Sequence, residues 1–268
     1  MNIRRFSVLY AVIAWHGFCI PEKAHAQTFI STRDIQLLHG RADATFEAGD
    51  HETARKIYEN VMGYRMRRQG PKAYEIGAIH NNVGLMHYTV GEYEKAFDLF
   101  QKGYLNVRGL KGDNHTDTAI CLCNMGYSKL ANNEQEAAME FFEKALKARL
   151  PLLGQNHPDI ADCHEGMGLC HTADNKSDEA LEAFQKCFDI RMKAYGENHV
   201  ETAAACMGLG MAYLGKNDFE KAEECDNQAR AILKKTGGVV VFRRNPESRL
   251  KGPTVRIFKA RSKLKRKP

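Results

Sequence analysis

The feature that most constrains this chain is a pattern that returns every 42 residues. A glycine is followed twelve residues later by an alanine, and four residues beyond the alanine by an aromatic residue. The positions on this step are Gly84, Gly126, Gly168 and Gly210, then Ala54, Ala96, Ala138, Ala180 and Ala222, then Tyr58, Phe100, Phe142 and Phe184. Three independent sets of residues on one step indicate a repeat architecture, in which each unit packs on its neighbours.

The recurring glycine predicts a close crossing of helices. Glycine inside a helix costs about 1 kcal/mol relative to alanine, so its return on one step points to a packing requirement. The alanine is expected to be the small residue on the partner helix, with the aromatic ring one turn further along the same face. Each repeat is therefore predicted to be a hairpin of two helices.

The unit that starts at Ala161 resembles a tetratricopeptide repeat. That family has a small residue at position 8, an alanine at position 20 and an aromatic at position 24, which are Gly168, Ala180 and Phe184 here. Its usual length is about 34 residues, and the extra residues contain three related loops. They are GDNHTD at 112–117, GQNHPD at 154–159 and GENHVE at 196–201. Such loops resemble the long repeats of kinesin light chains. The resemblance implies an all-α fold, a right-handed α-solenoid of five helix-turn-helix repeats.

These observations divide the chain into four parts. A leader of residues 1–26 and a linker of residues 27–34 precede the array, and a basic tail of residues 237–268 follows it. The five repeats are expected at 35–76, 77–118, 119–160, 161–202 and 203–236. In the first repeat Ala42 replaces the glycine, and such an imperfect copy is typical of a capping repeat. In the last, Asp226 replaces the aromatic, which predicts a face turned to water or to the tail.

The leader and the cysteines give opposing indications about the compartment. The basic pair at 4–5, the apolar run at 6–20 and the Ala-His-Ala at 24–26 form the pattern of a secretory signal peptide, which predicts a mature chain that begins at Gln27. One of the eight cysteines lies in the leader. The other seven fall in predicted helices without the spacing of a disulfide scaffold, which is typical of a reducing compartment. Export, an organelle, a short membrane anchor and the cytoplasm are all left open.

The tail carries a charge opposite to that of the array. Residues 237–268 hold 11 Lys or Arg and one Glu, a net charge of +10, whereas residues 27–236 carry −6. Residues 239–242 and 255–258 have strand-like composition and flank two turn signals, which predicts a small hairpin. The stretch from Lys259 is expected to be poorly ordered.

The basic side chains of the tail are candidates for binding a polyanion or an acidic surface. They are Arg243, Arg244, Lys259, Arg261, Lys263, Lys265, Arg266 and Lys267. The tail is expected to act separately from the array, as an electrostatic attachment. The alternatives are a nuclear-import-like run and a solvated tail that only aids solubility.

No motif for catalysis or for a cofactor emerges from the sequence. There is no phosphate loop, dinucleotide fingerprint or HExxH motif. His115, His157 and His199 recur on the 42-residue step, but equivalent residues two helices apart should be separated by about 16–20 Å. One metal ion cannot collect them, because its bonds to histidine are about 2 Å long. Each histidine is expected to cap the following helix, and the protein to be non-catalytic. A thiol enzyme using Cys123 or Cys170 is the enzymatic alternative.

The resemblance implies that the first helices of the hairpins line a concave groove, into which positions 2, 5, 6, 9, 12 and 13 point. In relatives an asparagine at position 6 holds the backbone of an extended peptide, and Asn82 and Asn124 match it, whereas residues 166 and 208 are glycine. An amide suits this role because it offers both a donor and an acceptor. The candidate peptide-binding residues are Asn81, Asn82, Tyr88, Asn124 and Tyr127. The alternative is that these side chains are merely solvated.

The function expected from these features is that of a protein–protein interaction adaptor. It would hold an extended peptide or a helix in the concave groove and would have no small-molecule substrate. The alternative is a structural subunit of a large assembly, anchored through its basic tail to nucleic acid, tubulin or a lipid surface.

Overall fold

The structure is a computed structural model that describes residues 31–70, 74–236, 239–243 and 254–258. Within these residues, ten helices form five consecutive hairpins and two short strands follow them. The hairpins are α2 (Thr32–Glu47) with α3 (His51–Gln69), α4 (Tyr74–Thr89) with α5 (Tyr93–Lys111), α6 (Thr116–Ala131) with α7 (Gln135–Leu153), α8 (Pro158–Ala173) with α9 (Ser177–Tyr195), and α10 (Val200–Gly215) with α11 (Phe219–Thr236). Among the described helices, none is long and apolar enough to cross a membrane.

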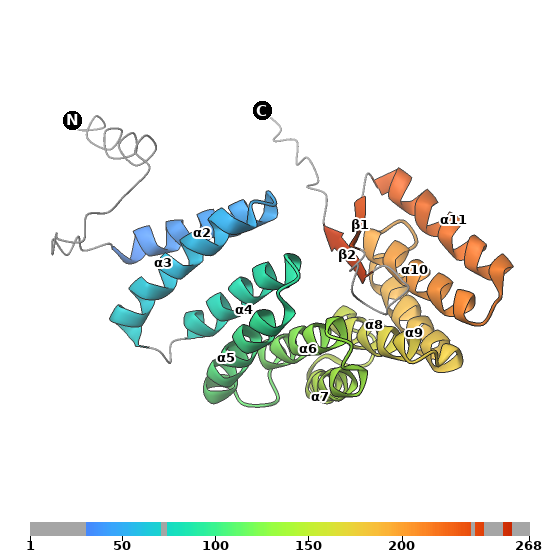
Figure 1. The fold of residues 1–268 in the computed structure, drawn as a ribbon, viewed down its shortest axis with the longest axis horizontal. Coiled ribbons are helices and arrows are strands. Elements are labelled where there is room, and N and C mark those ends of the chain that lie inside the picture. The colour runs from blue at the N-terminus through green and yellow to red at the C-terminus, as the bar shows by residue number, and fades with distance from the viewer. Residues whose placement is uncertain (1–30, 71–73, 237–238, 244–253, 259–268) are drawn as a thin grey trace.

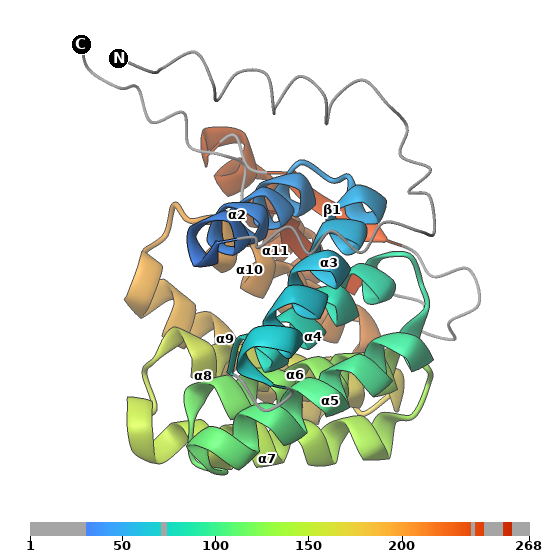
Figure 2. The same cartoon turned by 90° about the vertical axis from the view of Figure 1, so that its left-hand side faces the viewer.

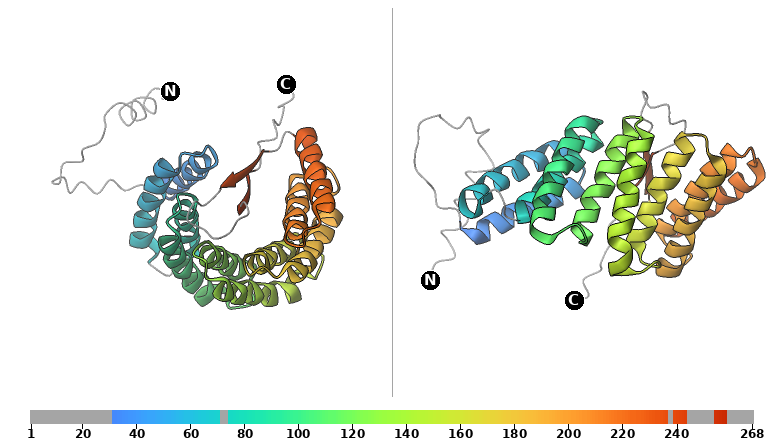
Figure 3. Two further views of the ribbon diagram at one scale, coloured as in Figure 1. Left: turned by 45° about the vertical axis from the view of Figure 1, so that its right-hand side comes forward. Right: turned by 90° about the horizontal axis from the view of Figure 1, so that it is seen from below.

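The hairpins stack side by side around an arc. Figure 1 shows them following one another along the chain, and Figure 2 shows the same stack from its N-terminal side. Each helix packs on the next, and the first helices α4, α6, α8 and α10 also contact one another in turn. Those first helices therefore line the inner, concave side of the arc in Figure 3, and the second helices lie outside. The predicted superhelix of five helical hairpins is confirmed.

The aromatic rings of the second helices form the centre of the core. Phe100, Phe142 and Phe184 are at most 1% exposed. A Cβ atom added to Gly168 would lie only 2.8 Å from Cε1 of Phe184, so only a hydrogen atom leaves room for the ring. The packing requirement predicted for this glycine is confirmed. The structure adds that the crowding atoms belong to the aromatic ring rather than to the recurring alanine.

Two of these rings, Phe142 and Phe184, are each also contacted by a glycine of the next repeat. A Cβ atom added to Gly166 on α8 would lie 2.4 Å from Cε1 of Phe142, and one added to Gly208 on α10 would lie 2.5 Å from Cδ1 of Phe184. Each of these rings therefore lies between two first helices and joins consecutive repeats. This explains why glycine takes the place of asparagine at position 6 of the last two repeats.

The loops are also set by residues on the 42-residue step. Within each hairpin the turn contains a residue with a left-handed backbone, at Gly49, Gly91, Asn133, Asn175 and Asn217. Such a conformation favours glycine and asparagine over other residues. Between hairpins, Nδ1 of His115, His157 and His199 accepts a hydrogen bond from the backbone N–H two residues later, at 3.1–3.2 Å. The histidines are therefore helix caps, as predicted.

The end of the array differs from the other repeats in the predicted way. Asp226 of α11 is partly exposed and forms an ion pair with Arg230 at 2.6 Å. With no ring at this position, a Cβ atom added to Gly210 would meet its nearest atoms at 3.5 Å, which is an ordinary contact. The last hairpin thus turns a charged face to water.

Two strands follow the array. β1 (Val239–Arg243) pairs antiparallel with β2 (Thr254–Phe258), with Val239 opposite Phe258, so the predicted hairpin is confirmed. β2 contacts α10, and the pair lies on the inner side of the arc (Figure 3). This contact differs from the expectation that the tail is separate from the array. The leader at 1–26, its predicted cleavage site and the stretch from residue 259 lie outside the described residues.

Candidate peptide-binding groove

The asparagines predicted to bind a peptide lie on the first helices of the second and third repeats. Nδ2 of Asn124 on α6 donates a hydrogen bond of 2.7 Å to Oδ1 of Asn81 on α4. Nδ2 of Asn82 instead donates to the hydroxyl of Tyr58, at 3.2 Å, and that hydroxyl also donates to the carboxylate of Asp43. The structure therefore brings Asn81 and Asn124 together, whereas Asn82 belongs to a neighbouring network with the first repeat.

The two predicted tyrosines are held by different contacts. The ring of Tyr127 packs edge-on against Phe142, with centroids 4.9 Å apart, and its hydroxyl donates to the backbone carbonyl of Asp162 at 3.3 Å. Burial raises the pKa of Tyr127 well above its usual value. Tyr88 packs edge-on against Tyr93, with centroids 5.2 Å apart. Tyr127 thus joins α6 to α8, and Tyr88 joins α4 to α5.

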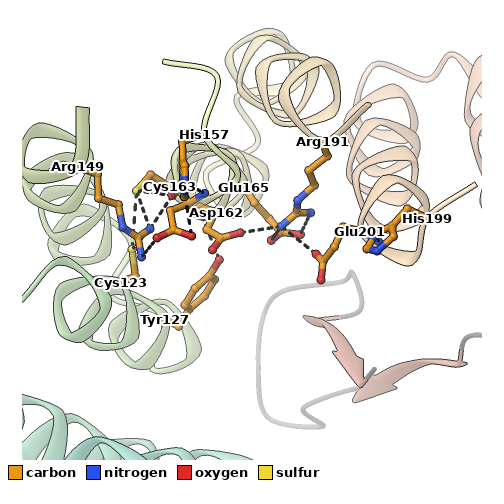
Figure 4. Close-up of polar contacts among 11 residues, drawn as sticks. Cys123, Tyr127, Arg149, His157, Asp162, Cys163, Glu165, Arg191, His199 and Glu201 are labelled. Atoms are coloured by element: carbon orange, nitrogen blue, oxygen red, sulfur yellow. Dashed lines mark hydrogen bonds and ion pairs between the residues drawn. The ribbon is translucent and has the colours of Figure 1, made fainter. Parts of the chain in front are cut away.

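An arginine that the sequence analysis did not single out gathers three carboxylates in the groove. Nη2 of Arg191 on α9 lies 3.0 Å from Asp162 and 2.9 Å from Glu165, both on α8, and 3.6 Å from Glu201 on α10 (Figure 4). The Arg191 side chain is only 3% exposed. Partial burial raises the pKa of Asp162, and the nearby charge of Glu165 raises it further, while Arg191 lowers it.

A second arginine lies between two thiols. Nη1 of Arg149 donates to the backbone carbonyl of Asp159 at 2.6 Å and lies 3.5 Å from each sulfur of Cys123 and Cys163. These sulfurs are 3.8 Å apart and buried (Figure 4). The hydrogen bond from Cys123 and the charge of Arg149 lower the pKa of Cys163, whereas the shared hydrogen bond and burial raise that of Cys123.

The environment of the two cysteines named in the thiol-enzyme alternative disfavours that alternative. Cys123 and Cys170 are both buried, and burial raises the pKa of Cys170 to about 12. Both side chains are therefore thiols at neutral pH, whereas the reactive nucleophile in such enzymes is the thiolate.

A signal for both arginines was present in the sequence. Residues 65, 149 and 191 are arginine on the 42-residue step, and residues 75, 117, 159 and 201 are acidic on the same step. The structure pairs them across successive repeats, with distances of 3.4 Å from Arg65 to Glu75 and 3.8 Å from Arg149 to Asp159. Val107 interrupts the series. Opposite charges a constant ten residues apart would have identified this inter-repeat contact.

The candidate polyanion-binding side chains lie almost entirely beyond the described part of the chain. Of the eight, only Arg243 falls in a described element, at the end of β1. The remaining seven lie outside the described residues.

The sequence itself decides the family. The sequence model of tetratricopeptide repeats matches residues 33–104, 75–150 and 159–235. The chain belongs to the tetratricopeptide repeat family. The matched segments together cover most of the five hairpins, so the repeats identified from the 42-residue step are repeats of this family. Proteins of this architecture present extended concave surfaces for binding. No curated protein matches the sequence.

Several solved structures share the fold at low sequence identity. BtubC (BKLC) from P. vanneervenii is 18% identical with a TM-score of 0.64, covering 81% of this chain and 86% of that one. Nearly identical TPR-like repeats from Podosopora anserina, described as a putative kinesin light chain, are 19% identical with a TM-score of 0.60, covering 75% and 96%. The likeness to kinesin light chain repeats is therefore confirmed for the fold.

A third solved structure contains a bound peptide. It is the Rap conjugation gene regulator of plasmid pLS20 in complex with the Phr* peptide. It is 12% identical to this chain with a TM-score of 0.64, and the match covers 81% of this chain and 60% of that protein.

Proposed function

We propose that this protein is a non-catalytic adaptor that holds an extended peptide in its concave groove, along α4, α6, α8 and α10. The observation that carries the proposal is the amide pair of Asn81 and Asn124. An asparagine amide has two N–H donors and an oxygen acceptor, and the hydrogen bond between these two side chains uses one donor of Asn124 and one lone pair of Asn81. The pair keeps both kinds of hydrogen-bonding group for a peptide backbone.

The position of this pair suits main-chain recognition. Both asparagines are half-buried, so hydrogen bonds made there are partly shielded from water. Their mutual hydrogen bond also fixes the two side chains before a ligand arrives, which reduces the entropy lost on binding. The proposed surface includes Asn82, Tyr88 and Tyr127, which flank the pair on the same two helices. The peptide in the Rap complex supports the proposal by showing that a protein of this fold binds one.

The test is to select peptides from a random displayed library against the full chain, and then to measure their affinity for variants. The double variant Asn81→Ala, Asn124→Ala should weaken the selected peptides about fivefold or more, because each lost hydrogen bond contributes about 1 kcal/mol. Its melting temperature should stay within a few degrees of that of the wild type. The matched control is Asn227→Ala on the exposed surface of α11.

Two results would contradict the proposal. Peptides that bind the double variant as tightly as the wild type do not use the amide pair. Failure to select any peptide, together with recovery of the chain only within a large assembly, would favour the structural-subunit alternative.

A further inference from the structure

The concave side of the fourth and fifth repeats has an excess of negative charge. Asp162, Glu165 and Glu201 converge on Arg191, so one positive charge faces three carboxylates. The Asp162 side chain is 44% exposed and that of Glu201 is 24% exposed, so both can be reached from the groove. Figure 4 shows this cluster on the side of α8 and α10 on which the two strands lie. The arrangement already binds one guanidinium group and keeps accessible carboxylate edges.

A strand from a basic segment of the same chain contacts a helix of this surface. β2 contacts α10, the helix that supplies Glu201. Residues 239–258, which include both strands, hold five Lys or Arg and one Glu, a net charge of +4. The charges of the segment and of the surface are therefore complementary, and the contact of β2 with α10 is an observation independent of that charge.

The connection between the helical array and the strands is very short. Only residues 237 and 238 separate the end of α11 at Thr236 from the start of β1 at Val239. A short tether gives a linked segment an effective concentration on the order of millimolar. A single exposed ion pair strengthens binding by no more than about fivefold. Even so, a tethered segment with only millimolar intrinsic affinity would occupy the surface for much of the time.

We propose that Asp162, Glu165 and Glu201 form a binding surface for extended segments rich in Lys and Arg, and that residues 239–258 occupy it within the same molecule. A basic partner peptide binds this part of the groove by displacing residues 239–258. The inference deepens the proposed function, on which it rests, by naming the chemistry of the partner and an internal competitor. Attachment of the tail to a polyanion is the competing assignment.

The experiment uses a fluorescein-labelled peptide of residues 239–258 and measures its anisotropy with the full chain at low ionic strength. The wild type is compared with a tail variant that carries five substitutions: Arg243→Ser, Arg244→Ser, Arg249→Ser, Lys251→Ser and Arg256→Ser. The labelled peptide should bind the tail variant about twofold more tightly than the wild type, because a tethered competitor whose effective concentration matches its dissociation constant blocks the surface about half of the time. Added salt should weaken this binding.

Substitutions in the surface are then made in the tail variant. Glu201→Gln should weaken the labelled peptide about threefold to fivefold. It is chosen because its contact with Arg191 is the longest of the three, at 3.6 Å, and Asp162→Asn provides a second test. The control is Glu140→Gln, an exposed carboxylate on α7 that is also paired with a cation, Lys144. Thermal unfolding of each variant verifies the fold.

Three results would overturn the inference. Equal affinity of the labelled peptide for the wild type and the tail variant would show that residues 239–258 do not compete for the surface. Unchanged affinity in both Glu201→Gln and Asp162→Asn would show that the carboxylates do not bind the peptide. In the wild-type background, Glu201→Gln should release the tail and tighten binding of a 20-nucleotide single-stranded DNA, whereas unchanged DNA affinity would favour the polyanion assignment.

The inference and the proposed function can fail separately. The library peptides and the variants of Asn81 and Asn124 test α4 and α6, and they do not depend on the charges of the tail. If those peptides bind as expected while the labelled tail peptide does not, only the present inference is wrong.

Discussion

Two glycines on α8, separated by a single residue, hold two different aromatic rings. Gly166 accommodates Phe142 of the preceding hairpin, whereas Gly168 accommodates Phe184 of its own. Because neither glycine has a side chain, α8 can pack closely against both neighbouring second helices, α7 and α9. A side chain at either position would collide with a ring in its observed place, so both glycines are needed for this packing.

This packing makes opposite predictions for two glycines at the same repeat position. Gly168→Ala should destabilise the protein by about 1–3 kcal/mol, because the new Cβ atom would lie 2.8 Å from Phe184. Gly210→Ala should be neutral or stabilise by up to about 1 kcal/mol, because its Cβ meets nothing closer than 3.5 Å and alanine favours a helix. Urea unfolding measures both, and a loss of stability in Gly210→Ala equal to that in Gly168→Ala would contradict the packing argument.

At the scale of the elements, the sequence predicts the helices well because their ends are marked by residues on the repeat. Helices α8 and α10 begin at Pro158 and Val200, directly after His157 and His199, which were expected to cap them. Helix α4 begins at Tyr74, ahead of residue 77, where the second repeat was expected to start, and the buried Ile76 continues its inward face.

The side-chain contacts of the groove were harder to predict. The partners of Asn124 and Arg191 come from neighbouring helices, so their distances depend on how closely the repeats stack. A periodic pattern gives the face on which a residue lies, but it does not give the atom that the side chain reaches. The acidic surface was missed for this reason, because only Glu201 recurs on the 42-residue step, whereas the residues 42 positions away from Asp162 and Glu165 are not acidic.

The interruption in the series of arginines predicts that the stability of the protein depends on pH. Where Val107 replaces the arginine, the hydroxyl of Tyr74 donates to Asp117 at 2.8 Å, and this bond raises the pKa of Tyr74 to about 12. The unfolded value is about 10, so this contribution to stability is complete below pH about 10 and is lost as pH rises through about 12.

The measurement compares the free energy of unfolding of the wild type with that of Tyr74→Phe across this range. The advantage of the wild type should shrink as the pH approaches 12. In an Asp117→Ala background the phenol has already lost its side-chain acceptor, so adding Tyr74→Phe should change the free energy of unfolding little at every pH. A constant difference between wild type and Tyr74→Phe up to pH 12 would contradict the role of this bond.

For the whole molecule, the two halves of the groove differ chemically. In the second and third repeats position 6 is Asn82 and Asn124, and Asn124 forms the amide pair with Asn81. In the fourth and fifth repeats that position is glycine, because Phe142 and Phe184 need the space, and carboxylates provide the polar groups instead. An extended ligand that spans both halves would be held by its backbone at one end and by basic side chains at the other.

The last hairpin has no aromatic ring at residue 226. A stack of repeats is a chain of monomers, and Asp226 acts as its terminator because it presents a charge where a ring would accept another unit. The opposite end is still receptive. Gly40 occupies the repeat position of Gly166 and Gly208, and a Cβ atom added to it would meet no atom of the described residues within 4 Å. Asp226→Phe should therefore allow one molecule to add to the next, head to tail, and such a contact does not close on itself.

Light scattering should show a molar mass that rises with concentration in Asp226→Phe, but not in Asp226→Asn. Adding Gly40→Leu should block the growth, and growth that persists in this double variant would mean that the units join through another surface.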